Sequence, residues 1–264
     1  MEGLTPRVLI IAGSDSGGGA GIQADIKTVT MLGGFAMTAI TAVTAQNTLG
    51  VQAVHPVPTG IVLAQIESVL SDLGADAIKI GMIGSAETAN AVADRLSGLD
   101  VPIVFDPVMV ATSGSVLAEP PTIAAFERLM RIPSVVTPNL PELEALGGEE
   151  AVLAHGCHLL AKGGHADGNY VIDRVLAPNG REIVRAEGKR IDTDDTHGTG
   201  CTLASALATG LGAGMPIKEA FVQAVRFVRI AILSAPCFGA GHGPIGHTLG
   251  HNPFEQLEGP DDDP

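Results

Sequence analysis

Short apolar runs alternate with longer amphipathic stretches along most of the chain. Apolar runs bounded by turn residues predict strands at Val8–Ala12, Ala36–Ala45, Ala77–Ile80, Val101–Phe105, Ser134–Thr137 and Cys157–Ala161. Apolar residues at helical spacing predict helices at Ile22–Met31, Ile61–Leu73, Ala86–Leu96, Ile123–Met130, Thr199–Leu211 and Ile217–Ser234. Because strands and helices alternate with short connections, the pattern indicates parallel βαβ units covered by helices on both faces.

One pair of predicted strands has no helix between its members. Tyr170–Leu176 and Glu182–Arg185 flank Pro178-Asn179-Gly180, which is a hairpin signal. The expected fold class is therefore α/β, with a mostly parallel central sheet and an antiparallel hairpin at one edge. No linker or internal repeat interrupts the pattern, so we expect a single domain over residues 1–254 and an acidic, disordered tail over residues 255–264.

Composition limits the partners of this fold. Of the 264 residues, 45% are hydrophobic and 17% are charged, and the formal net charge is −14. Such an acidic chain is a poor partner for nucleic acid or an anionic membrane, which are bound through basic clusters. Cys157, Cys201 and Cys237 form no C-x-x-C pair, so neither a zinc site nor a disulfide framework is predicted. The N-terminus shows no signal-peptide pattern, and we expect a cytoplasmic location.

The segment from Asp194 to Thr202 reads D-D-T-H-G-T-G-C-T and runs into a predicted helix. Gly198 and Gly200 allow successive backbone N–H groups to face one point, and the helix start adds its positive dipole end. This arrangement predicts an anion hole for a phosphoryl group in transfer. Cys201 at the helix start is expected to have an acidified thiol that accepts a proton from a substrate hydroxyl or positions it. The alternative is a small buried residue in a helix cap.

A second glycine-rich segment, residues 12–28, lies between the first predicted strand and helix. Its Gly19-x-Gly21-x-x-Ala24 spacing does not fit a dinucleotide site, because the glycines come several residues after the strand and no acidic residue follows at the required distance. No G-x-x-x-x-G-K-[ST] sequence occurs, which excludes a P-loop.

Both segments resemble motifs of the hydroxymethylpyrimidine/phosphomethylpyrimidine kinases, which belong to the ribokinase-like group. D-T-H-G-T-G-C-T is similar to their signature, in which Cys replaces the Asp of the commoner G-x-G-D. The resemblance implies that Gly198, Thr199 and Gly200 form the anion hole and that Cys201 is catalytic. A-G-S-D-S-G-G-G-A-G-I-Q-A-D is similar to their substrate loop, which implies that Gly13 and Asp25 contact a pyrimidine. For Asp25 a helix-dipole role is the alternative.

The resemblance continues in family order from Ala12 to Pro244. The motifs A-Q-N-T, K-I-G-M and D-P-V-M imply substrate contacts from Gln46, Met82 and Val108. The remaining motifs imply ATP or phosphate contacts from Asn139, Lys162, Thr196 and His242, and metal-organising carboxylates at Asp106 and Glu142. Residue types alone leave four alternatives: a solvent-facing Gln46, a core Met82, an Asn139–Glu142 capping pair and a loop His242.

The implied activity is ATP-dependent phosphorylation of 4-amino-5-hydroxymethyl-2-methylpyrimidine and of its monophosphate, for thiamine synthesis. The implied cofactors are ATP and Mg²⁺, a monovalent cation is left open, and a homodimer is expected. A pyridoxal or pyridoxine kinase of the same family and a non-catalytic pyrimidine-binding homologue are the alternatives. Two departures from the family pattern bear on ATP: the segment 142–157 is short and its expected helix contains Gly147-Gly148, and Asp195 stands where Asn is common.

Overall fold

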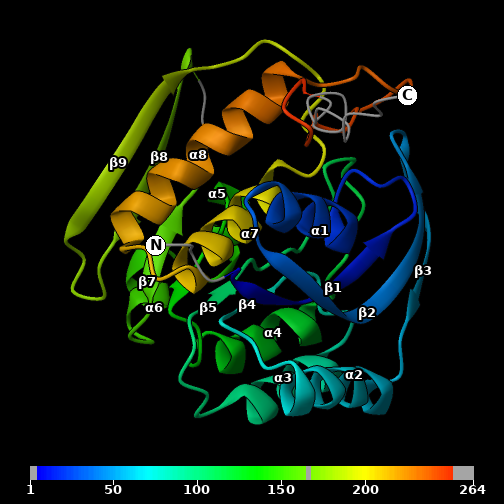
Figure 1. Ribbon diagram of the computed structural model, residues 1–264, viewed down its shortest axis with the longest axis vertical. Helices are drawn as coiled ribbons and strands as arrows, with labels where there is room; N and C mark the ends of the chain where they lie inside the picture. The colour runs from blue at the N-terminus through cyan, green and yellow to red at the C-terminus, as the bar shows by residue number, and fades with distance from the viewer. Residues whose placement is uncertain (1–4, 165–167, 252–264) are drawn as a thin grey trace, which may run out of the picture.

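The computed structural model describes residues 5–164 and 168–251, so His165 and the predicted tail lie outside the described residues. The strands of this part form one sheet in the order β3-β2-β1-β4-β5-β6-β7-β8-β9 (Figure 1). Neighbours from β2 to β7 pair in parallel, whereas β3, β8 and β9 pair antiparallel. The strands are β1 (Arg7–Asp15), β2 (Phe35–Asn47), β3 (Gly50–Pro56), β4 (Ala77–Ile80), β5 (Ile103–Phe105), β6 (Val135–Val136), β7 (His158–Ala161), β8 (Tyr170–Leu176) and β9 (Glu182–Lys189).

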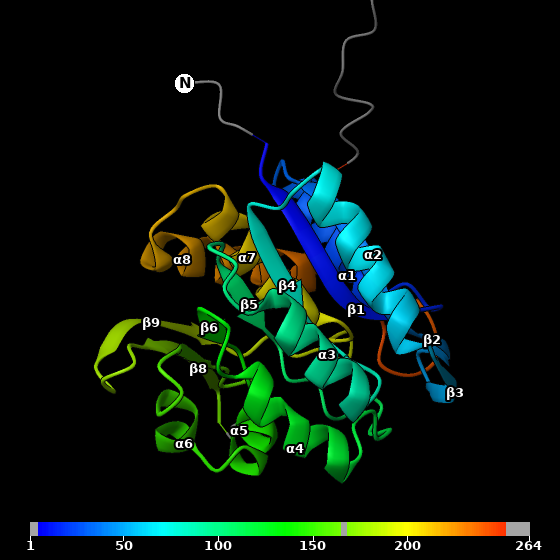
Figure 2. The ribbon, with the colours of Figure 1, turned by 90° about the horizontal axis from the view of Figure 1, so that it is seen from below.

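Helices cover both faces of the sheet (Figures 1 and 2). One face packs against α1 (Gly21–Met31), α7 (Thr199–Gly212) and α8 (Ile217–Leu233). The other face packs against α2 (Thr59–Asp72), α3 (Ala86–Leu96), α4 (Pro120–Leu129), α5 (Leu140–Ala145) and α6 (Glu149–Leu153). Every helix of the described ranges is too short or too polar to span a lipid bilayer.

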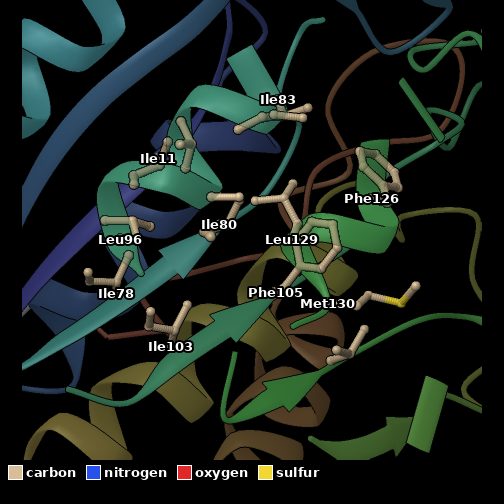
Figure 3. Packing of buried hydrophobic residues seen from close by; sticks show 14 of the residues in the cluster. Ile11, Ile78, Ile80, Ile83, Leu96, Ile103, Phe105, Phe126, Leu129 and Met130 are labelled. Carbon is tan, nitrogen blue, oxygen red and sulfur yellow. The ribbon is translucent and has the colours of Figure 1, made fainter. Parts of the chain in front are cut away.

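The alternation of side chains along the buried strands explains why both faces carry helices. In β1, Leu9 and Ile11 enter the core under α2, α3 and α4, whereas Val8 and Ile10 enter the core under α1 and α7. A strand that is apolar on both faces is stable only when both are covered, because each buried side chain gains about 1.5–3 kcal/mol by leaving water. Figure 3 shows the first core, where Phe105 and Phe126 meet edge to face with ring centroids 5.2 Å apart.

The structure confirms the predicted fold class, shifts the ends of several predicted elements by a few residues, and differs most from the prediction in three places. β3 was not predicted, because its residues are mostly exposed and lack an alternating apolar pattern. It pairs antiparallel with β2, so both edges of the sheet carry antiparallel strands. The single helix expected after Glu142 is two short helices, α5 and α6. Gly147 and Gly148 separate them, since their φ angles of 90° and 88° cannot continue a right-handed helix. β9 also extends to Lys189.

Candidate active site

A cavity with about 740 Å³ of empty space, part of it open to solvent, lies beside the carboxyl ends of the central strands. This is where parallel α/β sheets bind ligands. Its lining gathers residues from motifs that lie far apart in the sequence. The predicted site residues that line it are Gly13, Gln46, Met82, Asp106, Val108, Asn139, Glu142, Lys162, Gly198, Gly200 and Cys201.

The start of α7 forms one wall of this cavity. Gly198 is the N-cap, with φ of 89°, and no side chain caps the helix. A Cβ atom at Gly198 would lie 1.8 Å from the carbonyl oxygen of Gly19, so only glycine allows the two glycine-rich segments to touch. Among the described residues, no backbone carbonyl accepts a hydrogen bond from the amides of Gly200 or Cys201. These N–H groups are therefore available to an anion.

Thr199 and Thr196 do not line the cavity, unlike their glycine neighbours. The Thr199 amide donates to the carbonyl of Thr196 at 3.3 Å and closes a local turn. The expected anion hole of Gly198, Thr199 and Gly200 stays a prediction; Gly198 and Gly200 line the cavity together with Cys201, whereas Thr199 does not. A direct phosphate contact from Thr196 has no support in this geometry.

The thiol of Cys201 differs from the expectation of an acidified group. Burial raises the pKa of Cys201 to about 11, and the nearby Asp25 and Asp106 carboxylates act in the same direction. The ammonium of Lys79 opposes this rise without cancelling it. The dipole of the α7 start is outweighed because a thiolate loses most of its hydration in this position. At neutral pH Cys201 is therefore a thiol and a hydrogen-bonding group.

Asp25 is placed away from the cavity, contrary to the expected pyrimidine contact. Its fully buried carboxylate lies 2.8 and 3.0 Å from the Lys79 ammonium, which is also fully buried. The Ser205 hydroxyl donates to the same carboxylate at 2.5 Å. Burial works against the charge on Lys79, but Asp25 outweighs it and raises the pKa of the ammonium. Lys79 itself lines the cavity, so Asp25 acts on the site through Lys79.

Lys162 lies between the two carboxylates that were expected to organise a metal. Its ammonium is 2.7 Å from Asp106 Oδ1 and 3.9 Å from Glu142 Oε2. A Cβ atom at Gly200 would lie 3.3 Å from Lys162 Nζ, so this cation also borders the start of α7. Burial works against the charge on Lys162, but Asp106 and Glu142 outweigh it and raise its pKa. The cluster is a cation held by two acids beside the start of α7.

Asn139 and Glu142 form the capping pair that the sequence left as an alternative role. The Glu142 amide donates to Asn139 Oδ1 at 2.9 Å, and the Asn139 amide donates to Glu142 Oε2 at 2.8 Å. This capping box begins α5 directly after β6. Burial raises the pKa of Glu142, an effect that Lys162 and the backbone donors oppose. Both side chains still border the cavity, so capping and ligand contact are compatible.

Asp15 and His197 make a buried pair that the sequence reasoning missed. His197 Nε2 lies 2.8 Å from Asp15 Oδ2 and 3.2 Å from Gln46 Nε2. Asp15 also accepts from backbone N–H groups within residues 17–20. Burial raises the pKa of Asp15, but the His197 hydrogen bond and these donors outweigh it and lower the pKa below its ordinary value. Asp15 lies in the glycine-rich segment 12–28, and His197 lies in the segment from Asp194 to Thr202. Their places in these two motifs were the sequence signal that could have identified them as site residues.

The remaining predicted residues divide between the cavity and its surroundings. Gly13 and Met82 pack together, because a Cβ atom at Gly13 would lie 3.0 Å from the Met82 sulfur. His242 does not line the cavity; it is exposed, and its Nδ1 lies 3.2 Å from the Asp194 carbonyl. The carboxylate of Asp195 packs against Gly243, where a Cβ atom would lie 1.8 Å from Asp195 Oδ1, and it also does not line the cavity.

Comparison with known proteins shows to which family this chain belongs. A family model described as phosphomethylpyrimidine kinase matches residues 15–246. The chain is 46% identical over 261 residues to the hydroxymethylpyrimidine/phosphomethylpyrimidine kinase of Rhizobium meliloti, with 92% of this chain and 97% of the relative covered.

Solved kinase structures share the fold. Phosphomethylpyrimidine kinase from Clostridium difficile matches with a TM-score of 0.74 at 36% identity, covering 86% of this chain and 100% of that chain. Pyridoxal kinase from Staphylococcus aureus in complex with AMP-PCP and pyridoxal matches with a TM-score of 0.83 at 32% identity, covering 94% and 95%. The family match and the 46% identical relative decide the assignment: the chain belongs to the phosphomethylpyrimidine kinase family, whose fold is ribokinase-like.

Proposed function

We propose that this chain transfers the γ-phosphoryl group of ATP to the hydroxymethyl group of 4-amino-5-hydroxymethyl-2-methylpyrimidine, and then phosphorylates the monophosphate. One observation carries the proposal: a single cavity holds the Gln46 amide and the open amides at the start of α7. The first group suits the edge of an aminopyrimidine, and the second suits a phosphoryl group. The presence of both groups in one cavity supports a pyrimidine site next to a phosphoryl site.

The ring site is apolar on its sides and polar at one edge. Met82, Val108 and Gly13 line it, and Gly13 leaves room beside the Met82 sulfur. Gln46 offers a donor and an acceptor to the ring edge, which complements an amino group next to a ring nitrogen. The buried Asp15–His197 pair lies against this amide and restrains it. A restrained amide binds with a smaller loss of side-chain entropy than a free one.

The phosphoryl site combines amides with fixed cations. The N–H groups of Gly200 and Cys201 and the ammonium of Lys162 border the cavity, and the fully buried side chain of Lys79 lies directly behind its lining. These groups are in place before the reaction, so they stabilise developing negative charge with little reorganisation. Asn139 lies beside them and is available for a nucleotide phosphate. His242 and Thr196 lie outside the cavity and are assigned no contact.

The thiol of Cys201 is proposed to position the substrate hydroxyl in line with the γ-phosphorus. With a pKa of about 11, the thiol is protonated at neutral pH and cannot act as a general base in that state. Phosphoryl transfer passes through a loose transition state in most analyses, so the reaction depends mainly on positioning and on charge stabilisation. A positioned thiol next to Lys79 is compatible with that demand.

Asp106 and Glu142 are proposed to hold the Mg²⁺ of MgATP through water molecules. The described residues contain no cluster of three His, Cys, Asp or Glu side chains suited to a metal. Lys162 lies between the two carboxylates, so these groups can offer few direct ligands to a metal. Mg²⁺ usually keeps several of its water ligands and needs only one or two carboxylates, so it fits this cluster. When bound, Mg²⁺ supplies neutralisation of the phosphate charges. The short 142–157 segment begins at Glu142 of this cluster, and Asp195 does not line the cavity.

A substrate panel tests the proposal against pyridoxal phosphorylation. ADP release is measured with hydroxymethylpyrimidine, its monophosphate, pyridoxal and pyridoxine at a fixed MgATP concentration. We expect kcat/KM for hydroxymethylpyrimidine to exceed that for pyridoxal by roughly a hundredfold, because the Gln46 edge matches the aminopyrimidine. A higher value for pyridoxal supports the alternative kinase, and no ADP release with any alcohol supports the non-catalytic homologue. The homodimer, the monovalent cation and the cytoplasmic location stay predictions.

A further inference from the structure

The segment after α8, residues 239–247, crosses three parts of the molecule that surround the cavity. We call these residues the C-terminal segment. The His242 amide donates to the Thr48 carbonyl at 3.0 Å, in the turn between β2 and β3. The Gly243 carbonyl accepts from the His197 amide at 3.1 Å, and the Gly246 amide donates to the Ala231 carbonyl of α8 at 2.8 Å. The segment therefore joins the β2–β3 turn, the residues before α7 and the end of α8.

Glycines let this segment lie against its neighbours without a gap. A Cβ atom at Gly241 would lie 2.2 Å from the Thr48 carbonyl oxygen, and one at Gly246 would lie 1.9 Å from the Ser234 carbonyl oxygen. Contacts this close exclude any larger residue and fix the path of the backbone. These contacts therefore restrain the backbone next to His247, the last residue of the segment.

His247 reaches the first turn of α7. Its Nε2 lies 2.9 Å from the Thr202 hydroxyl oxygen, and both side chains are buried. Thr202 directly follows Cys201, and its amide donates to the carbonyl of the Gly198 N-cap at 2.9 Å. The hydrogen bond thus joins the C-terminal segment to the turn of helix that carries the open amides.

The ring of His247 is uncharged at neutral pH and forms a hydrogen bond with the Thr202 hydroxyl. Burial lowers the pKa of His247 to about 4, and the Lys27 ammonium of α1 acts in the same direction. A hydrogen bond with the Ile245 backbone opposes them. A neutral imidazole has one N–H and one acceptor nitrogen. The neutral ring can therefore pair with the Thr202 hydroxyl through Nε2 in either tautomer.

We propose that His247 is a positioning residue for phosphoryl transfer, acting through Thr202 on the start of α7. The N-cap of α7 is Gly198, which has no side chain to restrain the first turn. The His247–Thr202 hydrogen bond supplies a restraint at that place. It holds the Gly200 and Cys201 groups at the cavity wall, where a displacement of about 1 Å can cost roughly a hundredfold in rate. The inference rests on the phosphoryl role proposed for the α7 start.

The test compares two substitutions of the same type in the same helix. Thr202→Val removes the hydroxyl that meets His247, and Thr209→Val removes another buried hydroxyl of α7, which donates to the Ser205 carbonyl at 2.7 Å. Thr202→Ser keeps the hydroxyl. Measurements are kcat, KM for MgATP and the rate of Cys201 alkylation by iodoacetamide, resolved by peptide mass spectrometry. The alkylation rate reports the α7 start without any need for catalysis.

We expect Thr202→Val to lower kcat by roughly tenfold to a hundredfold and to change Cys201 alkylation several-fold, while Thr209→Val and Thr202→Ser stay within about twofold of the wild type. His247→Phe should match Thr202→Val, and the double variant should be no worse than either single one. Equal kcat and equal alkylation in Thr202→Val and Thr209→Val overturn the proposal. Altered alkylation with unchanged kcat supports the restraint and contradicts the phosphoryl role of α7 instead.

Discussion

Lys79 and Asp25 form an ion pair whose side chains are both 0% exposed, with the ammonium 2.8 Å from one carboxylate oxygen. Lys79 projects from β4 and Asp25 from α1, so the pair joins the sheet to a helix under the cavity floor. The pairing explains why Lys79 is tolerated in an interior position. It also sets the electrostatic environment of Cys201, which both charges influence.

Asp25→Asn is expected to destabilise the fold by roughly 3–5 kcal/mol, because it leaves the Lys79 ammonium buried without its counter-charge. Urea unfolding measures this. The matched control is Arg95→Met, which breaks the exposed Arg95–Glu67 pair and should cost less than about 1 kcal/mol. Equal losses of unfolding free energy in the two variants would show that the buried pair contributes no more to stability than the exposed one. Replacing both Lys79 and Asp25 by apolar residues should cost less than Asp25→Asn alone.

Gly198→Ala is expected to lower kcat by roughly a hundredfold, since the new Cβ atom must push the Gly19 carbonyl away and move the α7 start. Gly214→Ala is the control: Gly214 also has a positive φ, of 78°, but a Cβ atom there meets nothing within 4 Å. Both variants share the backbone strain of about 1–2 kcal/mol. The difference in kcat between the two variants therefore measures the effect of the close approach between Gly198 and the Gly19 carbonyl. Similar kcat values would show that this approach does not matter for catalysis.

Gln46→Leu is expected to raise KM for hydroxymethylpyrimidine by roughly tenfold or more and to leave KM for MgATP within about twofold. The substrate amine would lose its partner while the anion wall stays intact. Gln52→Leu, on the neighbouring β3 and outside the cavity, should change neither constant. Steady-state kinetics with each substrate varied in turn give both values. A rise in the KM of MgATP alone would place the pyrimidine elsewhere.

Stability is expected to fall between about pH 6.5 and pH 4 because of His247. Its pKa in the folded chain is lowered to about 4 from an ordinary 6.5, so the unfolded chain binds the proton more readily. The contribution is complete above pH 6.5, is lost as the pH falls towards 4, and amounts to roughly 3 kcal/mol. Chemical unfolding at each pH measures it. His247→Gln cannot titrate and should show a shallower decline, whereas an equal decline would assign the effect to other groups.

The sequence predicted the central layers because their residues combine periodicity with burial. β4 and α3 have the predicted bounds, since Ala77–Ile80 is wholly buried and α3 has a capping Ser85 with a strong apolar stripe. β3 escaped prediction because its pairing with β2 depends on tertiary contacts of exposed residues. The gathering of most motif residues in one cavity follows from the same parallel topology.

The chemistry of individual residues was harder to predict. Asp25 was expected at the substrate, but it forms a buried ion pair with Lys79. The two residues are 54 positions apart, so the local sequence around Asp25 could not predict this pairing. The pKa of Cys201 was expected to fall from its place at a helix start, and the burial that raises it comes from other elements. Asp15 and His197 are 182 positions apart, so their pairing became visible only in three dimensions.

Cys201→Ala tests most directly whether phosphoryl transfer takes place at the start of α7. The account predicts that kcat with hydroxymethylpyrimidine falls by roughly a hundredfold or more, while KM for the pyrimidine stays within about twofold. Cys237→Ala, which alters an exposed thiol, should leave both constants unchanged. Wild-type kcat in Cys201→Ala, measured in the same ADP-release assay, would contradict the role assigned to this wall of the cavity.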